Sequence, residues 1–434
     1  MKSKMELNKL AEANPWWSTK KVPEELKGLP RLDYALLVKS IDVQEVTIIV
    51  GVRRAGKSTF MYQMVEKLLE KGVQPEQILF INFEDTRFDE DSLEDIYQLY
   101  RTNLNPDKKA YIFFDEIHKK EKWEAWIRRH YDLKTNCKFV VSGSCSYLLK
   151  KEYATLLTGR NLTFEVYPLS FKEFLGFKKL ELDISKAVKG LLTEKEKFLL
   201  LNSFEEYLSQ GGFPRVLFQE KEFKTKLLDQ YYNDILFKDI INRYNLNSQK
   251  TSDFAKYIMT NVTSLISLRN VRNVLGLSYE SIKDYLSHAH DAFLFFTLDH
   301  FSYSMKEQKS RAPKVYCVDN GLRNAVSFKF IKDNGRLAEN LAFIELKRKN
   351  YDIYYWKSTN EKEVDFVIKK DNQTLTAINV TYTDEIPERE ITSLMEFKKE
   401  FSKAKELIIL TKNLEKKEKG INYIPLWKWL LEND

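Results

Sequence analysis

The chain has 434 residues, of which 43% are hydrophobic and 13% aromatic, and its formal net charge is +7. This length exceeds one ordinary core, so two or three domains are expected, and the composition excludes a disordered chain. The apolar runs are shorter than the roughly 18 residues of a membrane span, and the N-terminal stretch lacks the apolar core of a signal peptide. We therefore expect a cytoplasmic protein with no membrane partner; the mild positive charge favours nucleic acid only weakly.

Residues 46–60, VTIIVGVRRAGKSTF, combine a β-branched strand, a loop and the start of a helix. The loop matches GxxxxGK[ST], in which backbone N–H groups point at phosphate oxygens and the helix N-terminus adds positive potential. ATP is the expected cofactor, with Lys57 on the β- and γ-phosphates and the Ser58 hydroxyl on Mg²⁺. For Arg54, as for Arg53, a pair with a nearby acid is the alternative to phosphate contact. The predicted nucleotide-binding set is Gly51, Arg54, Ala55, Gly56, Lys57, Ser58 and Thr59.

A second buried strand, AYIFFDEI at residues 110–117, ends in two adjacent carboxylates. In a nucleotide hydrolase of this kind the first carboxylate holds Mg²⁺ and the second activates water. Asp115 is therefore predicted as the magnesium residue and Glu116 as the residue that polarises the attacking water.

Polar residues also follow two other apolar strands. Ser142 or Ser144, after CKFVV, stands where additional-strand ATPases place a residue that senses the γ-phosphate; a Ser-Gly-Ser turn is the alternative. Asn82 and Glu84, after QILFI, could couple partner binding to Glu116, although simple turn residues are the alternative there.

Gly159-Arg160 stands just before the strand LTFEV. Oligomeric ATPases present an arginine on this segment to the neighbouring subunit, where it stabilises the charge that develops during phosphoryl transfer. A homo-oligomer, such as a hexameric ring, is expected on this interpretation. A surface salt bridge is the alternative role.

Residues 191–250 have a helical pattern that is typical of a lid, and residues 251–325 show helix, turn, a second helix capped by Ser278, and then strands. That order is typical of a winged helix-turn-helix, which often binds DNA. Three basic residues are candidate contacts to DNA phosphates: Arg269, Arg272 and Lys283. Protein docking is the alternative use of such a segment.

In residues 326–434, a helix carrying Glu339 is followed by the strands DIYYWKS, EVDFVIKK and TLTAINVTY. A restriction-type nuclease places an acid on the first of the last two strands and Glu-x-Lys on the second. Asp365 stands at the first position, but Asn379-Val380-Thr381 occupies the second. A two-metal site is therefore poorly supported, and we expect a nuclease-like domain that has lost cleavage and retained a binding role.

Together these stretches resemble the AAA+ ATPases of archaea and bacteria in which a DUF4143 domain follows the ATPase core. The resemblance rests on motifs in order along most of the chain: NPWW from Asn14, GVRRAGKST, FFDEI followed by Trp123, SGSCSYLL, TGR with PLSFKEF, GGFPRV, VYCVDNGL, GRLAENLAFIELKRK and EVDF. It implies an α/β protein with a P-loop core of the additional-strand type (residues 1–190), a helical lid (191–250), a winged-helix-like segment (251–325) and a nuclease-like α/β domain (326–434).

Two functions are therefore expected as alternatives. The first is a Mg²⁺-dependent ATPase that works as a ring and couples hydrolysis to binding, translocation or remodelling of DNA. The second is a nucleotide-controlled switch that acts on a protein partner, without stimulation by DNA. A third function, nuclease activity, is not expected, because Asn379 and Thr381 stand where the acid and the lysine of such a site are needed, unless acids from elsewhere complete the metal site.

Overall fold

The structure is a computed structural model that describes residues 7–31, 35–144, 157–327, 333–369 and 374–432. The chain forms two compact units, Met1–Val166 and Tyr167–Asp434. Among the described residues, no helix combines the length and the apolar character that a membrane span requires.

The boundary between the units lies before residue 190, where the end of the ATPase core was predicted. The helices that follow Val166, α9 (Phe171–Phe177) and α10 (Ile184–Val188), pack against elements of the second unit, namely α11 (Glu194–Gln210) and α22 (Leu426–Glu432). These two short helices therefore belong to the second unit. The sequence does not reveal this, because only tertiary packing decides it.

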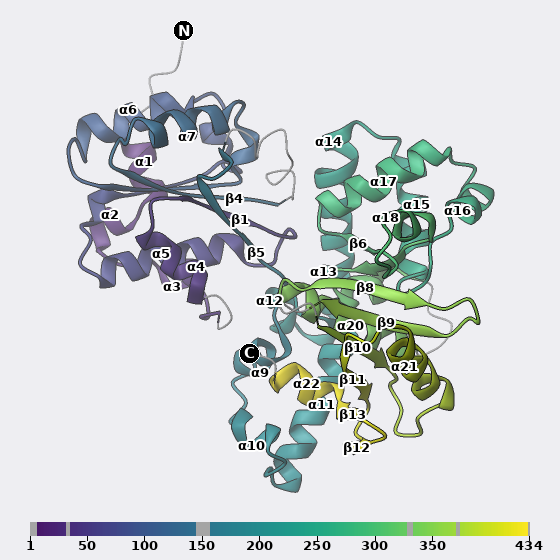
Figure 1. Ribbon diagram of the computed structural model, residues 1–434. Helices are drawn as coiled ribbons and strands as arrows, with labels where there is room; N and C mark the ends of the chain where they lie inside the picture. Colours follow the sequence, from purple (N-terminus) through teal and green to yellow (C-terminus); the bar gives the residue numbers. More distant parts are fainter. Residues whose placement is uncertain (1–6, 32–34, 145–156, 328–332, 370–373, 433–434) are drawn as a thin grey trace. The chain divides into compact units, whose positions relative to one another are not determined.

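The first unit is a five-stranded parallel sheet with helices on both faces (Figure 1). Its strand order is β2-β3-β4-β1-β5. Strands β1 to β4 are mostly buried on both faces, which explains their apolar sequences, whereas the edge strand β5 is partly exposed. Helices α6 and α7 cover one face and α5 the other. The strands are β1 (Val46–Val50), β2 (Ile78–Asn82), β3 (Ala110–Asp115), β4 (Cys137–Gly143) and β5 (Asn161–Glu165). The helices are α1 (Leu7–Ala13), α2 (Trp16–Thr19), α3 (Glu24–Lys27), α4 (Ala35–Lys39), α5 (Lys57–Glu70), α6 (Leu93–Asn103) and α7 (Trp123–Asp132).

The N-terminal NPWW motif covers the exposed edge of strand β2. The Asn14 side chain donates to the Phe80 carbonyl at 3.0 Å and accepts from the Phe80 N–H at 2.6 Å. The indoles of Trp16 and Trp17 both donate to the carbonyl of Ile78, at 3.3 and 2.8 Å. An uncovered edge strand invites pairing with other chains, so this motif serves to close the sheet.

The second unit begins with helices that pack on its own later elements. Helices α11 and α13 contact α19, and α11 also contacts α20. After them come three helices, α15 to α17, and the antiparallel pair β6–β7. The elements are α12 (Pro214–Leu217), α13 (Lys221–Asp234), a π-helical turn (Ile235–Ile241), α14 (Asn242–Tyr244), α15 (Ser248–Thr260), α16 (Leu268–Leu275), α17 (Tyr279–Asp291), β6 (Phe295–Leu298), α18 (Met305–Ser310), β7 (Lys314–Cys317) and α19 (Asn320–Val326).

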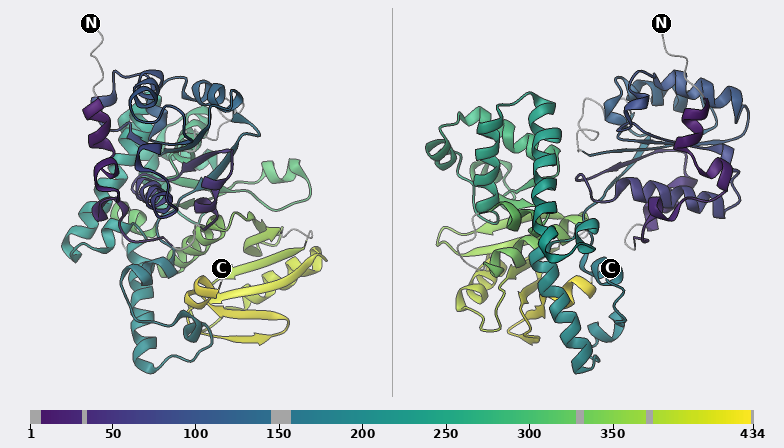
Figure 2. Two further views of the ribbon diagram at one scale, coloured as in Figure 1. Left: turned by 90° about the vertical axis from the view of Figure 1, so that its left-hand side faces the viewer. Right: turned by 180° about the vertical axis from the view of Figure 1, so that it is seen from behind.

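A mixed six-stranded sheet completes the second unit, and its green to yellow strands lie side by side in Figure 2. Strands β8, β9 and β10 form an antiparallel meander, while β11 and β13 run parallel to β10. Helix α21 packs against β9, β10 and β11, and α20 and α22 also contact the sheet. The elements are α20 (Asn334–Arg348), β8 (Asp352–Lys357), β9 (Glu363–Lys369), β10 (Leu375–Val380), α21 (Glu388–Glu400), β11 (Ala404–Thr411), β12 (Lys416–Glu418) and β13 (Ile421–Pro425).

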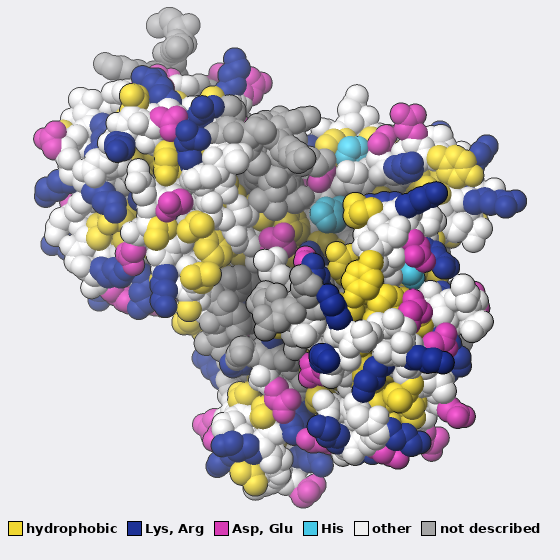
Figure 3. Space-filling view, viewed as in Figure 1, with side chains coloured by type: hydrophobic (Ala, Val, Ile, Leu, Met, Phe, Trp, Pro, Cys, Tyr) yellow, Lys and Arg dark blue, Asp and Glu magenta, His cyan; other side chains and the backbone are white. Residues whose placement is uncertain are grey.

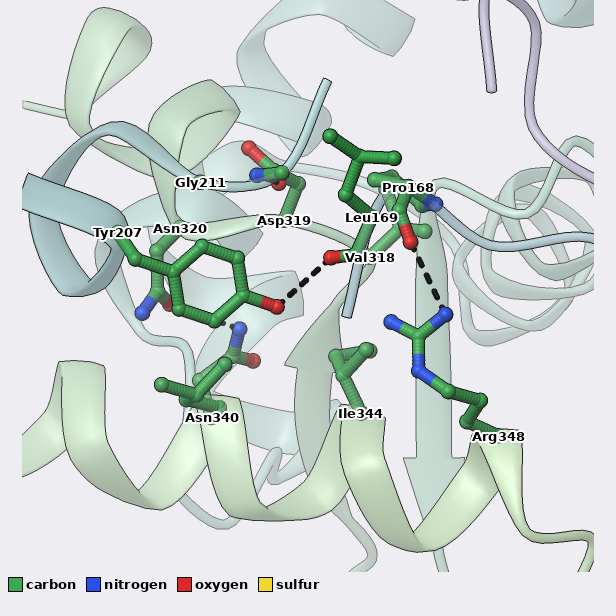
Figure 4. A pocket seen from close by; sticks show the side chains of 12 residues that line it. Pro168, Leu169, Tyr207, Gly211, Val318, Asp319, Asn320, Asn340, Ile344 and Arg348 are labelled. Atoms are coloured by element: carbon green, nitrogen blue, oxygen red, sulfur yellow. Dashed lines mark hydrogen bonds between the residues drawn. The ribbon is translucent and has the colours of Figure 1, made fainter. Parts of the chain in front are cut away.

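Several motifs that are far apart in the sequence meet in one buried polar junction of the second unit (Figure 4). Asp319 caps α19 through the N–H groups of residues 321 and 322 and also accepts from the Gly212 N–H at 2.7 Å. Asn340 donates to Asn320 at 2.9 Å. A Cβ on Gly212 would lie 2.4 Å from the carbonyl of Leu169. GGFPRV, CVDNGL, GRLAEN and PLSF are therefore parts of one packing arrangement.

Candidate functional site

The phosphate loop lies between β1 and α5, and two of its glycines are required by its shape. Gly51 has φ +148°, and a Cβ there would lie 2.0 Å from the carbonyl oxygen of Val166. Gly56 has φ +102° and directly precedes the first residue of α5. These conformations let the loop curl so that its N–H groups and the N-terminus of α5 can face an anion.

Lys57 folds back over this loop. Its ammonium donates to the carbonyls of Gly51 at 2.9 Å and Val52 at 3.2 Å, and it lies 3.8 Å from Oε1 of Glu116. Only 5% of the residue is exposed. A cation that is held against the loop in this way can exchange its carbonyl partners for phosphate oxygens, which bind a cation more strongly.

Asp115 lies at the carboxyl end of β3 and is fully buried. The hydroxyl of Ser142, at the end of the neighbouring strand β4, donates to Oδ1 of Asp115, whereas Oδ2 accepts no hydrogen bond from any described residue. Burial, together with the charge of Glu116, raises the pKa of Asp115 to about 6, although Ser142, Ser58 and Lys57 act to lower it.

The orphaned Oδ2 fits a magnesium ion. Mg²⁺ takes few protein ligands and completes its shell with water and phosphate oxygens, so one carboxylate and the nearby Ser58 hydroxyl are a sufficient protein contribution. Within the described ranges no cluster of three or more His, Cys, Asp or Glu side chains could bind a metal by itself. Asp115 and Ser58 would therefore hold the ion that accompanies ATP and neutralises its phosphate charge.

Glu116 follows in a left-handed conformation, with φ +52°. Its backbone N–H donates to Ser142 Oγ at 3.2 Å, and its Oε2 accepts from the Ser144 N–H at 3.0 Å. Nδ1 of His118 lies 3.3 Å from the same oxygen. The Ser144 N–H thus fixes the carboxylate of Glu116 beside Lys57, while the Ser142 hydroxyl contacts the carboxylate of Asp115 and the backbone of Glu116.

Asp115→Asn is expected to stabilise the nucleotide-free first unit at about pH 8, by on the order of 1 to 3 kcal/mol, and by roughly half as much at about pH 5. The folded pKa of about 6 exceeds the ordinary 3.8, so the folded chain binds the proton more tightly and the free energy of unfolding falls as pH rises between these values. Asparagine removes this loss. Thermal melting across pH tests it, with Asp107→Asn at an exposed site as control; equal shifts at both pH values would contradict it.

Arginines surround the phosphate loop, and one of them was not predicted. Arg53 donates to Glu84 at 2.5 Å, so this arginine pairs with an acid, and Arg54 has a left-handed backbone with φ +70°. The side chain of Asn82 accepts from the Glu84 N–H at 2.8 Å, as a turn residue does. Arg31 from the N-terminal segment donates to the Ala55 carbonyl at 2.9 Å. No sequence motif marks Arg31, because only folding brings it to the loop.

Arg160 lies at the other end of the sheet from the phosphate loop. The Val46 N–H at the start of β1 donates to the Arg160 carbonyl, whereas the loop follows Val50 at the end of β1. The guanidinium donates to Asp132 at 2.8 Å, and 30% of the side chain is exposed. Within one chain Arg160 therefore makes a surface ion pair, and any action on ATP requires a neighbouring subunit.

The other predicted contacts lie in the second unit. Arg269 and Arg272 on α16 and Lys283 on α17 are exposed, and the Arg272 guanidinium lies 5.0 Å from the centre of the Tyr279 ring. Glu339 on α20 and Asp365 on β9 come together, as a nuclease-like arrangement requires. Lys314 joins them, a residue that the sequence reading did not consider.

Comparison with known proteins identifies the domains. Residues 43–175 match the family described as "AAA domain", residues 201–332 a domain of unknown function (DUF8612), and residues 334–429 the domain of unknown function DUF4143. The "Uncharacterized protein MJ1544" of Methanocaldococcus jannaschii is 34% identical over 407 residues, which cover 89% of this chain and 88% of that protein. This chain belongs to the family of AAA-domain proteins with a C-terminal DUF4143 domain. An "Uncharacterized protein" of Haemophilus influenzae is 31% identical over 408 residues, which cover 91% of this chain and 96% of that one.

The AAA+ fold of this family member agrees with its strand order and its family match. Solved structures similar to it include AMPPCP-bound DnaA from Aquifex aeolicus, with a TM-score of 0.28 and 13% identity over 64% of this chain and 92% of that one. A DNA replication initiation factor has a TM-score of 0.25 and 15% identity over 59% and 85% of the two chains. The predicted AAA+ core and DUF4143 domain are confirmed. The DUF8612 match spans most of the predicted lid and all of the predicted winged-helix segment as one domain.

Proposed function

We propose that this AAA-domain protein is a Mg²⁺-dependent ATP hydrolase that works as a homo-oligomer, such as a hexameric ring, and couples hydrolysis to work on DNA. One observation carries the ATPase part of the proposal: Lys57, Asp115, Glu116 and Ser142 converge at the carboxyl edge of the first sheet. In this proposal Lys57 binds the β- and γ-phosphates. Glu116 accepts a proton from water as its oxygen attacks the γ-phosphorus, and ADP leaves.

Helices α16 and α17 are the proposed DNA contact. Arg269 and Arg272 are exposed on α16, and Lys283 is exposed on α17, where a helix-turn-helix presents its second helix to a groove. Contacts of this kind to phosphate would make binding fall steeply with salt.

Three observations favour a nucleotide-controlled switch for a protein partner as the second candidate. Glu280 and Asp284 are exposed beside Lys283 on α17, so this helix has no excess of positive charge. Val274 and Tyr279 are 65% and 43% exposed in the same segment, as suits protein docking. On the face seen in Figure 3, basic and acidic side chains are interspersed rather than gathered by sign.

Steady-state ATP hydrolysis with Mg²⁺, alone and with single-stranded, duplex or branched DNA, separates these two candidates. Lys57→Ala serves as the blank. The proposal expects several-fold stimulation by at least one DNA form, lost in an Arg269→Glu/Arg272→Glu variant and kept in a Lys195→Glu/Lys197→Glu variant, which reverses two exposed charges on α11. A hydrolysis rate that no DNA form changes would favour the switch. A rate no higher than that of the Lys57→Ala blank would refute both candidate functions.

A further inference from the structure

Three carboxylates of the second unit surround one buried ammonium. Lys314, on strand β7, lies outside the six-stranded sheet, while Glu339 is on α20 and Glu363 and Asp365 are on β9. The Lys314 Nζ is 3.0 Å from Glu339 Oε1, 2.6 Å from Glu363 Oε1 and 3.0 Å from Asp365 Oδ1. Only 3% of the lysine side chain is exposed.

The ammonium is paired with all three acids. Of its three N–H donors, two make hydrogen bonds, to Glu339 Oε1 and to Asp365 Oδ1, and Glu363 adds an ion pair. Two of the three carboxylates are fixed by other donors as well: Tyr316 donates to Glu339 at 2.8 Å, and the Val380 N–H donates to Oδ2 of Asp365 at 2.9 Å. A buried charge is tolerated only with such complete pairing, so this cluster is an ordered site and not a chance surface contact.

The neutral residue at the position expected for a second acid is turned away from this cluster. The amide nitrogen of Asn379 donates to Glu390 Oε2 at 2.8 Å and to Ser393 Oγ at 3.0 Å, both on α21. Its amide oxygen accepts from the Asp365 N–H at 3.2 Å. Asn379 therefore supports the strand and helix beside Asp365 and presents no oxygen to the space that Lys314 fills.

We propose that the Lys314 ammonium occupies the cation position of the nuclease-like domain, in place of a divalent metal ion. Strand β7 supplies the positive charge, so the ion pairs of Lys314 also attach the β6–β7 pair to α20 and β9. The site is closed to metal in the native chain, and removal of the ammonium converts the three carboxylates into a vacant divalent-cation site. This inference does not depend on ATP hydrolysis by the first unit.

The competing interpretation gives Lys314 the role of the missing nuclease lysine, which would position water beside a metal on Glu339 and Asp365. Both interpretations bring a lysine and two acids together, but they differ in whether the native chain binds the metal. The distances favour the first, because the ammonium lies within 3.0 Å of an oxygen of each of the three acids and so fills the space between them.

The test counts bound Mn²⁺ by electron paramagnetic resonance on the full, nucleotide-free chain. Lys314→Met keeps the volume of the stem without its charge, and Lys309→Met removes a lysine that pairs with Asp299 but is 65% exposed. The proposal expects one additional Mn²⁺ per chain in Lys314→Met, none in Lys309→Met, and loss of the gained ion in Lys314→Met/Asp365→Asn. Dependence on Asp365 separates this ion from any Mn²⁺ in the first unit.

Two results would overturn the proposal. One is a folded Lys314→Met chain, judged by circular dichroism, that gains no Mn²⁺. The other is a native chain that loses one Mn²⁺ on Asp365→Asn substitution, which would establish a metal site of the nuclease kind. If Lys314→Met does not fold, Lys314→Gln replaces it, because its amide still donates to the carboxylates; the same gain of one Asp365-dependent ion is then expected.

Discussion

Replacing Glu116 with glutamine is expected to slow ATP turnover by about 10²-fold or more while ATP still binds. A glutamine oxygen can still accept the Ser144 N–H that now reaches Glu116 Oε2 at 3.0 Å, so the strand end keeps its shape. The amide cannot accept a proton from water, which removes the general base. Phosphate release measures turnover, and a fluorescent ATP analogue measures binding.

Glu84→Gln is the matched control, because it makes the same chemical change at the end of the neighbouring strand region. Glu84 pairs with Arg53 and is not among the groups that contact Asp115 or Lys57 in the described chain. Turnover in this control should stay within a few-fold of the native protein. A Glu116→Gln protein that hydrolyses ATP as fast as this control would remove Glu116 from its assigned role.

The nucleotide site could be predicted from sequence because its parts are local or lie at strand ends. The loop from Gly51 to Ser58 is one continuous segment, and its glycine conformations follow from its spacing. Asp115 and Ser142 end neighbouring parallel strands, so sheet order brings them into contact. The sequence did not predict the partner of each side chain. The Ser142 hydroxyl, for example, was expected to contact a phosphate and instead donates to Asp115.

Other parts of the molecule could not be predicted because long-range packing decides them. Lys314 begins an apolar strand, and nothing near it in the sequence indicates that three acids from α20 and β9 surround it. Arg31 reaches the phosphate loop only through the fold of the N-terminal segment. Gly212, in the motif GGFPRV, has a structural role. Its N–H donates to Asp319, and the absence of a Cβ allows the carbonyl of Leu169 to approach closely.

Arg160→Ala is expected to reduce ATP turnover by about 10³-fold if neighbouring subunits share a nucleotide site. The alternative is that Arg160 only makes the surface ion pair with Asp132. Exposed pairs of this kind contribute about 0.2–1 kcal/mol to stability, which is far too little to account for such a loss. Asp132→Ala breaks the same pair and leaves the guanidinium in place, so it is the matched control and should retain turnover. Equal losses in the two variants would contradict action on a neighbour.

Mixing two inactive proteins then tests whether the site is shared. An Arg160→Ala subunit keeps Glu116, and a Glu116→Gln subunit keeps Arg160, so a mixed assembly contains some interfaces in which an intact Glu116 faces an intact Arg160. Turnover should therefore rise above that of either protein alone and reach a maximum at intermediate ratios. Glu116→Gln mixed with Lys57→Ala provides the comparison, because both lesions lie in the subunit's own nucleotide site and no interface regains a complete set. If mixing with Arg160→Ala gives no gain at any ratio, Arg160 does not take part in catalysis. Its role is then the surface ion pair with Asp132.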